Sequence, residues 1–179
     1  ADCSGVTKAV NAAVAVPNGI IMVSPSATSP SLSSVPDNGT FWRTAPSDAK
    51  GGQVLAQIAL DRGISEIAIT YENSDYGKGL SEVFAAAFTS GGGVVTTNDP
   101  HENGKGDYSA EVGVLASAGG DALAVLGYLD QAGGAIVQGA LDSGAFDLFV
   151  LGDGMIGQAL ADSIGSDLNG SFGSVPGST

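Results

Sequence analysis

A carboxylate inside a glycine-rich turn is the first feature of this sequence that could do chemistry. Asp153 lies in Gly152-Asp153-Gly154-Met155-Ile156-Gly157, a full G-x-G-x-x-G match. Such a match can hold a dinucleotide, because its glycines let a helix N-terminus approach a pyrophosphate. Here it follows the fourth strand of a repeating series, and the carboxylate would face the phosphates. We therefore favour Asp153 as a ligand-binding carboxylate, with a plain structural turn and a dinucleotide site as the alternatives.

Two tyrosines occupy comparable places, each directly after an apolar run. Tyr76 lies in Asn73-Ser74-Asp75-Tyr76-Gly77-Lys78-Gly79, and Tyr128 follows Gly127. Ser74 or Asp75 is expected to cap a helix there in any case. Because the carboxyl ends of parallel strands converge on one crevice, Tyr76, Tyr128 and Asp153 are predicted to lie together.

Hydroxyl-bearing residues near the N-terminus form a third group. Ser24–Thr28 offers hydroxyls and free backbone amides in an extended loop, which suits recognition of a small polar group. The alternative is an ordinary solvent loop, since Ser/Pro clusters are common in loops. Ser4 is expected to cap a helix whose unpaired N–H groups could also hold an anion.

The sequence contains no recognisable catalytic or metal-binding motif. Cys3 and the single histidine, His101, lie in unrelated segments, and His101 falls in the polar loop Asp99–Asp107, where we expect it to be solvated. Zinc spacings, G-x-S-x-G and the P-loop are all missing from the sequence, so we expect neither an enzyme nor a cofactor. Cys3 is expected to be a small buried residue, or half of a disulfide whose partner lies outside this chain.

The composition is that of a folded α/β protein, with 43% hydrophobic and 14% charged residues. Nineteen acidic residues against six Lys and Arg give a net charge of −13. This charge repels phosphate backbones and anionic lipids, which argues against nucleic acid or a membrane surface as a partner. No apolar run is long enough to cross a membrane, and the first five residues have neither the basic nor the apolar region of a signal peptide.

A strand–helix rhythm from about residue 47 must position the candidate residues. Apolar runs recur about 26–28 residues apart at Ile67–Thr70, Val94–Thr97, Ala122–Leu126 and Leu148–Leu151, with a weaker one at Ser171–Val175. Helical periodicity lies between them, most clearly at Leu80, Val83, Phe84, Ala87 and Phe88. Short strands that are apolar on both faces and alternate with helices predict a doubly wound parallel α/β sheet.

Residues 1–46 do not follow this rhythm. We expect a helix over Thr7–Val16, a buried strand over Ile20–Val23, a long loop over Ser24–Pro36, and a short strand or hinge at Phe41–Thr44. One helix and one strand cannot bury their apolar faces alone. The segment 1–46 is therefore predicted to be the end of an incomplete second domain, and 47–179 a nearly complete α/β domain.

Together these segments resemble the type I periplasmic binding proteins, specifically the branched-chain amino-acid (Leu/Ile/Val) binding proteins of ABC transporters. The resemblance is carried by Gly19-Ile20-Ile21-Met22-Val23-Ser24-Pro25-Ser26-Ala27-Thr28-Ser29-Pro30, Phe41-Trp42-Arg43-Thr44, Ser74-Asp75-Tyr76-Gly77-Lys78-Gly79 and Leu151-Gly152-Asp153-Gly154. It extends to about residue 176. A complete member is about twice as long, so this chain would be a fragment holding the tail of the N-terminal lobe and most of the C-terminal lobe.

The resemblance implies a site in which two lobes close over an amino acid. The ligand carboxylate would be held by Ser4 and by the loop residues Ser26, Ala27 and Thr28, and the ammonium by Asp153, where the family usually has glutamate. Tyr76 and Tyr128 would line the site. Family members often carry a disulfide matching Cys3. The aspartate leaves open an amino acid other than leucine, an amide or a related small solute.

The resulting hypothesis is a periplasmic, monomeric solute-binding component of an ABC importer that delivers its ligand to a membrane permease. Two alternatives remain at this point. One is a ligand-sensing receptor or regulatory domain of the same fold, and the other is a Rossmann-type oxidoreductase fragment that uses Gly152–Gly157.

Overall fold

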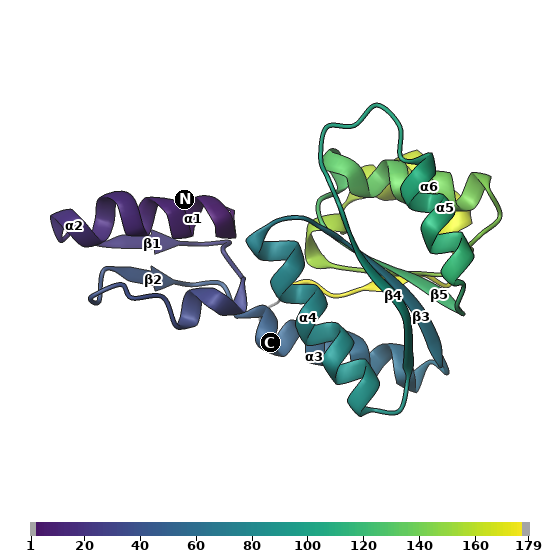
Figure 1. Ribbon diagram of the computed structural model, residues 1–179, viewed down its shortest axis with the longest axis horizontal. Coiled ribbons are helices and arrows are strands. Elements are labelled where there is room, and N and C mark those ends of the chain that lie inside the picture. Colours follow the sequence, from purple (N-terminus) through teal and green to yellow (C-terminus); the bar gives the residue numbers. More distant parts are fainter. Residues whose placement is uncertain (1–2, 177–179) are drawn as a thin grey trace.

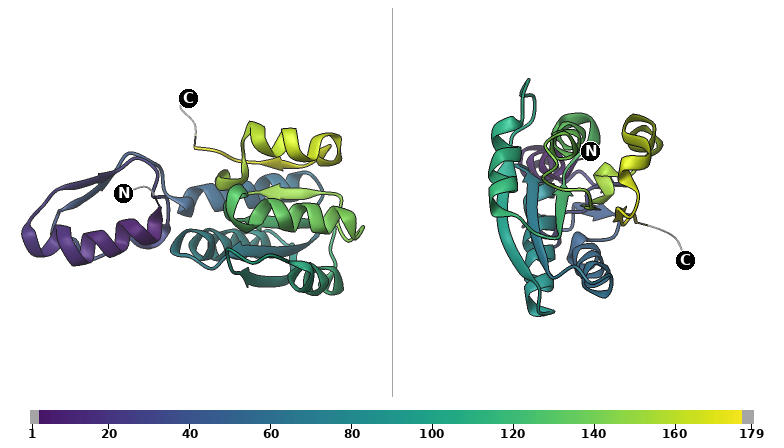
Figure 2. Two further views of the ribbon diagram at one scale, coloured as in Figure 1. Left: turned by 90° about the horizontal axis from the view of Figure 1, so that it is seen from above. Right: turned by 90° about the vertical axis from the view of Figure 1, so that its right-hand side faces the viewer.

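The computed structural model describes residues 3–176, which form a larger and a smaller α/β unit joined by residues 44–47 (Figure 1). The smaller unit extends from one end of the larger one (Figure 2). Each unit is built on a parallel sheet. None of the helices between residues 3 and 176 has both the length and the hydropathy needed to span a bilayer.

The larger unit contains a parallel sheet of five strands in the described residues, in the order β4-β3-β5-β6-β7. The strands are β3 (Glu66–Glu72), β4 (Val94–His101), β5 (Ala122–Leu126), β6 (Phe149–Leu151) and β7 (Phe172–Gly173). Each of the five predicted runs overlaps one of them, and the doubly wound parallel sheet is confirmed.

Helices cover both faces of this sheet. They are α3 (Asp48–Asp61), α4 (Asp75–Ser90), α5 (Ser109–Ala118), α6 (Gly134–Asp142) and α7 (Gln158–Ile164). Along β5, Ala124 packs into the cluster with Leu55 and Phe84 of α3 and α4, and Val125 packs into the cluster with Ile136 of α6. Successive side chains of a strand face opposite sides, so both faces must be apolar, as the sequence predicted.

The strand order reverses between β3 and β5, and this reversal fixes where a ligand can bind. From β3 the chain passes through α4 to the edge strand β4, then crosses back through α5 to β5 on the other side of β3. The segments that leave the carboxyl ends of β3 and β5 therefore diverge to opposite faces. Open α/β sheets bind ligands in the crevice that this divergence creates.

The smaller unit pairs β1 (Met22–Ser24) with β2 (Phe41–Arg43) beside a continuous helical segment, Ser4–Asn18. Gly19 ends the helix with a positive φ of 62°, which glycine adopts without steric cost. The helix begins three residues before the predicted Thr7, and the strand begins two residues after the predicted Ile20.

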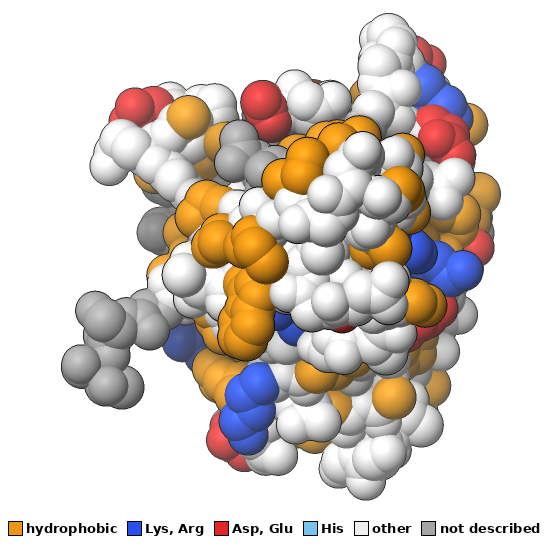
Figure 3. All heavy atoms as spheres, turned by 90° about the vertical axis from the view of Figure 1, so that its left-hand side faces the viewer, with side chains coloured by type: hydrophobic (Ala, Val, Ile, Leu, Met, Phe, Trp, Pro, Cys, Tyr) orange, Lys and Arg blue, Asp and Glu red, His pale blue; other side chains and the backbone are white. Residues whose placement is uncertain are grey.

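The expected burial of Ile20–Val23 is wrong. Ile20, Ile21 and Val23 are 52%, 63% and 54% exposed, and Trp42 on the neighbouring strand is also exposed. The reason is that no other segment between residues 3 and 176 covers this part of the small sheet. Hydrophobic side chains are visible over this end of the molecule (Figure 3).

The two units touch at the N-terminal half of α4. Lys8 Nζ of α1 (Ser4–Val10) forms an ion pair with Asp75 Oδ1 at 2.9 Å. At Gly79, a Cβ atom would lie 2.9 Å from Cδ of Pro30 and 3.1 Å from Oγ of Ser29. Only a glycine lets α4 approach the loop of the smaller unit this closely.

A candidate ligand-binding cleft

Asp153 begins a short 3₁₀ turn, Asp153–Met155, directly after β6. The hydroxyl of Tyr76 donates a hydrogen bond to Asp153 Oδ1 and accepts one of 3.1 Å from the backbone N–H of Gly154. Tyr76 is 3% exposed, and burial, reinforced by the negative charge of Asp153, raises its pKa well above the usual value. Tyr76 is therefore a neutral donor that holds the Asp153 carboxylate in place.

The two tyrosines meet as predicted from the strand ends. Tyr76 follows β3 and Tyr128 follows β5, and their rings stack with centroids 4.9 Å apart and an interplanar angle of 27°. Tyr128 is half-buried, and its hydroxyl is hydrogen-bonded to the side chain of Cys3. The structure thus brings Tyr76, Tyr128 and Asp153 into one group at the carboxyl end of the sheet.

Packing explains the glycine in the middle of the G-x-G-x-x-G match. A Cβ atom at Gly154 would lie 2.5 Å from the carbonyl oxygen of Gly127 and 2.8 Å from the Tyr128 ring. The turn can therefore press against the end of β5 only because residue 154 is glycine. At Gly157, the last glycine of the match, an added Cβ would meet nothing within 4 Å.

The loop after β1 is fixed by its own hydrogen bonds. Ser24 Oγ accepts from the backbone N–H of Ala27 at 3.0 Å and from that of Ser26 at 3.4 Å. The expectation of free amides is wrong at these two positions, because the Ser24 hydroxyl closes a tight turn. Ala27 is fully buried, Thr28 is nearly so, and Ser26 is exposed.

Arg43, at the end of β2, also fixes the loop after β1, through its guanidinium group. Its Nη1 donates to the carbonyl oxygens of Ala27 (3.2 Å) and Ser29 (2.9 Å), and its Nη2 donates to Ser33 Oγ (2.5 Å). Burial lowers the pKa of Arg43, while Asp48 acts in the opposite direction. The planar guanidinium can make these bonds at once, which explains why the Phe41-Trp42-Arg43-Thr44 motif accompanies the serine loop.

Ser4 has a different role from the expected helix cap. Cys3 occupies the N-cap position, and Ser4 is the first residue of α1. Ser4 is 1% exposed, and its Oγ accepts from the backbone N–H of Ser29 at 3.1 Å. Its hydroxyl hydrogen takes no part in this bond. Ser4 therefore fixes the serine loop against the helix.

A cleft of about 390 Å³ lies between the two units, next to these residues. It is lined by Pro25, Ser26, Thr28, Thr44, Ala45, Pro46, Asp153 and Pro176. Hydroxyls from the smaller unit thus share a cavity with a carboxylate from the larger one. Ser4, Ala27, Tyr76 and Tyr128 are not among its lining residues; they support those that are, through Ser29, Arg43 and Asp153.

Asp48 is a site residue that the sequence reasoning missed. It is the first residue of α3, and Ser47 caps that helix, with its Oγ accepting from the backbone N–H of Ala49. Asp48 is 6% exposed and hydrogen-bonds to the side chain of Thr28, and it lines a second cleft of about 530 Å³ that shares Asp153 with the first. Burial raises the pKa of Asp48 to about 6. The sequence did offer one indication that Asp48 belongs to the site. It is an acidic residue four positions after Thr44, at the junction of the two predicted domains.

A family model described as Periplasmic binding protein matches residues 1–178. This chain belongs to the periplasmic binding protein family. The family expected from the serine loop and the Asp153 turn is thereby confirmed.

Three known proteins illustrate what this periplasmic binding protein is similar to. It is 33% identical to Leu/Ile/Val-binding protein homolog 3 of Brucella melitensis over 154 residues, which are 82% of this chain and 41% of that protein. A leucine binding protein from Thermotoga maritima matches with a TM-score of 0.79 at 24% identity, over 93% of this chain and 47% of that one. An ABC transporter substrate-binding protein from Desulfitobacterium hafniense, solved in complex with Leu, matches with a TM-score of 0.69 at 20% identity, over 86% and 45%. The chain spans less than half the length of these relatives.

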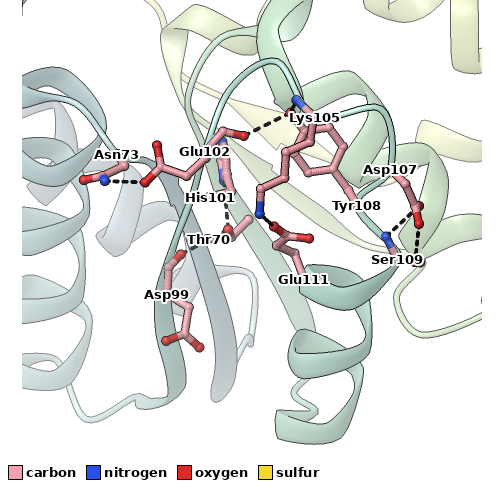
Figure 4. Close-up of polar contacts among 10 residues, drawn as sticks. All are labelled: Thr70, Asn73, Asp99, His101, Glu102, Lys105, Asp107, Tyr108, Ser109 and Glu111. Carbon is pink, nitrogen blue, oxygen red and sulfur yellow. Dashed lines mark hydrogen bonds and ion pairs between the residues drawn. The ribbon is translucent and has the colours of Figure 1, made fainter.

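Two expectations about the burial of reactive side chains of the binding protein are wrong. Cys3 is exposed and not buried, and its alternative role as half of a disulfide with a partner outside this chain stays a prediction. His101 is 1% exposed and not solvated, because β4 continues through Asp99 to His101 at the carboxyl end of the sheet. Its Nδ1 hydrogen-bonds to Thr70 Oγ1 at 2.9 Å (Figure 4). Burial lowers the pKa of His101 to about 4, against the opposing effect of Glu111 and Glu102, so the imidazole is neutral at pH 7.

The polar contacts around His101 are structural. Asn73 donates to Glu102, Lys105 pairs with Glu111, and Tyr108 donates to the backbone of Glu102, which together tie the loop after β4 to the sheet (Figure 4). Among the described residues, no group of three or more His, Cys, Asp and Glu side chains is placed to hold a metal ion.

Proposed function

We infer that this chain is part of the solute-binding component of an ABC importer, and that its cleft holds an amino acid. The observation that carries this inference is the cleft in which Ser26 and Thr28 of one unit face Asp153 of the other. A zwitterion requires donors on one side and an anion on the other, and each bond to a charged group is charge-assisted. The names of the relatives, a Leu/Ile/Val-binding protein homolog and a leucine binding protein, support a branched-chain or similar amino acid.

The roles of the site residues follow from their placement. Asp153, oriented by Tyr76, would receive the ammonium group. Ser26 and Thr28 would form the wall toward the carboxylate, and Ser4, Ala27 and Arg43 would fix the loop that carries them. The stacked rings of Tyr76 and Tyr128 lie behind Asp153, and they would border the apolar part of the ligand once the two lobes close, because aromatic faces bury a large area at low entropic cost.

The whole protein would bind between two lobes, with residues 1–46 belonging to one and 47–179 to the other. Ligand contacts from both sides favour the closed arrangement of the lobes. We further infer a periplasmic location, a monomeric state, delivery to a membrane permease and no chemistry on the ligand. These inferences rest on the family and on the two-sided cleft.

The test is calorimetric titration of the full-length protein with the twenty standard L-amino acids and, separately, with NAD. We expect at least one amino acid to bind and NAD to give no heat. Asp153→Asn is expected to weaken amino-acid binding by roughly thirtyfold or more, because losing one partner of a buried charge pair costs about 2–5 kcal/mol. The matched control is Asp162→Asn, an exposed carboxylate bonded to Gln158 on α7. Binding of NAD alone, or unchanged affinity of the Asp153 variant, would contradict the proposal.

A further inference from the structure

The turn before β7 contains an asparagine that is followed by a glycine. Asn169 and Gly170 are its two central residues, and the backbone N–H of Ser171 closes it by donating to the carbonyl oxygen of Leu168 at 2.9 Å. Asn169 has a φ of −57° and a ψ of 127°, and Gly170 has a φ of 90°, which are the angles of a type II turn. The hydrogen bond of such a turn does not use the peptide unit between the two central residues. The N–H of Gly170 is therefore not required by the turn.

An Asn-Gly pair can react within its own backbone. The glycine nitrogen, after losing its proton, attacks the side-chain carbonyl carbon of the asparagine and closes a five-membered succinimide ring. The new C–N bond displaces the side-chain nitrogen, which leaves as ammonia. Water then adds to one of the two ring carbonyls and opens the ring, which gives aspartate or isoaspartate. Glycine favours the first step, because it has no Cβ atom to restrict the approach.

The chain contains four such pairs, and the structure separates them by the hydrogen bonds of their reacting groups. The asparagines are Asn18, Asn38, Asn103 and Asn169. Both reacting groups are held at the first pair. Asn18 Nδ2 donates to the carbonyl oxygen of Val14 at 2.8 Å, and the N–H of Gly19 donates to that of Val16 at 3.3 Å.

One reacting group is held at each of the next two pairs, and neither is held at the last. The N–H of Gly39 donates to Asp37 Oδ1 at 3.0 Å, and Asn103 Nδ2 donates to Glu72 Oε1 at 2.6 Å. Asn169 is exposed, and within residues 3–176 neither its side-chain amide nor the N–H of the following glycine makes a hydrogen bond. Asn169 therefore has the fewest contacts to break before it reacts.

We propose that Asn169 is a site of spontaneous deamidation, and that isoaspartate at this position loosens β7 from β6. Isoaspartate carries the main chain through its side-chain carbon, so it lengthens the backbone by one methylene carbon directly before β7. This strand has only two residues, which pair with Val150 and Leu151 of β6. A strand this short has little other pairing to keep it in register.

Two contacts show that the position of β7 depends on this turn. Ser171 Oγ accepts from the backbone N–H of Phe149 at 3.0 Å. Arg62 lies over the ring of Phe172, 4.2 Å from its centroid, and its Nη1 donates to the carbonyl oxygen of Gly170 at 3.4 Å. Residues 174–176, which line the 530 Å³ cleft, follow β7 directly, so this strand connects the turn to the wall of the cleft.

The experiment incubates the full-length protein at pH 8, where the glycine nitrogen loses its proton more readily, and follows all four pairs by peptide mapping with mass spectrometry. Deamidation replaces NH₂ with OH and adds about 1 Da. We expect the Asn169 peptide to gain this mass first. It should react roughly tenfold faster than the Asn18 peptide or more, because two hydrogen bonds must break before Asn18 can react. Hydrogen exchange at the β7 amides should become roughly tenfold faster in the converted protein.

Asn169→Gln is the matched variant, because glutamine would have to close a six-membered ring and reacts far more slowly. Its β7 amides should exchange at the same rate before and after incubation, whereas Asn18→Gln should age like the parent protein. A mass gain at Asn18 or Asn38 ahead of Asn169, or no gain at Asn169, would overturn the assignment of the site. Unchanged exchange at β7 in protein converted at Asn169 would overturn the effect on the strand. Neither result bears on the proposed function, because no ligand is used.

Discussion

At the scale of single residues, Tyr76 connects Asp153, Gly154 and Tyr128 at the carboxyl end of the sheet. The Tyr76 oxygen donates to Asp153 and accepts from the Gly154 amide, while its ring stacks on Tyr128. Two carboxylates, Asp48 and Asp153, then face a cleft in which the described residues place a single lysine, Lys50, and no arginine. Such an arrangement is costly without a cation, and under the proposed function this cost would favour a ligand that carries an ammonium group.

We predict that Tyr76→Phe destabilises the protein by about 1–2 kcal/mol, because the half-buried Gly154 amide loses its acceptor. It should also weaken amino-acid binding, since Asp153 is no longer held in place. Thermal unfolding and calorimetry of the full-length protein measure the two effects. Tyr71→Phe is the matched control, because the Tyr71 hydroxyl makes no hydrogen bond within the described residues. Equal effects at both positions would contradict the assigned role of Tyr76.

At the scale of elements, two of the three glycines in the motif after β6 differ in what packing requires of them. Gly154 presses against Gly127 and Tyr128, whereas Gly157 has an extended φ of 177° and open space around it. The motif therefore contains one glycine required by packing and one that is not.

We predict that Gly154→Ala displaces this turn and lowers amino-acid affinity at least tenfold, because the added carbon would lie 2.5 Å from a backbone oxygen that cannot rotate away. Gly157→Ala should leave affinity within about twofold, since any residue adopts its backbone conformation. Titration of both full-length variants gives the comparison. Loss of binding in Gly157→Ala alone would point to a dinucleotide-type use of the motif.

The helices and strands with clear periodicity were predictable from sequence. Their burial was predictable only where the segments that pack against both of their faces are present in the described residues. Apolar runs such as Ala122–Leu126 identified strands covered on both faces, and the ends of those strands located Tyr76, Tyr128 and Asp153 together. The same reasoning failed at Ile20–Val23, because nothing in the described residues covers that strand. It also failed at His101 and Asp48, where polar residues are buried by contacts between segments far apart in sequence, which periodicity does not report.

At the scale of the whole molecule, the two units contact each other at α4, through the Lys8–Asp75 ion pair and the close approach of Gly79 to Pro30. The exposed Lys8–Asp75 ion pair contributes little, about 0–1 kcal/mol. The close approach of Gly79 to Pro30 is the more demanding contact, because the proline ring cannot rotate away.

We predict that Gly79→Ala shifts the full-length protein toward a more open arrangement and weakens amino-acid binding. Alanine in a helix is otherwise favoured over glycine by about 1 kcal/mol, so a loss must come from the clash with Pro30. Gly113→Ala on α5, with nothing within 4 Å, is the control and should show only the stabilisation. Small-angle scattering with and without ligand measures the opening. An unchanged scattering profile and affinity would show that this contact does not set the lobe angle.

The connection at residues 44–47 has one more consequence. Thr44, Ala45 and Pro46 line the cleft, and Asp48 follows directly, yet these same residues carry the chain from one unit to the other. Under the proposed function, a substitution in this connection would therefore change the lining of the ligand cleft and the joint between the two units at the same time.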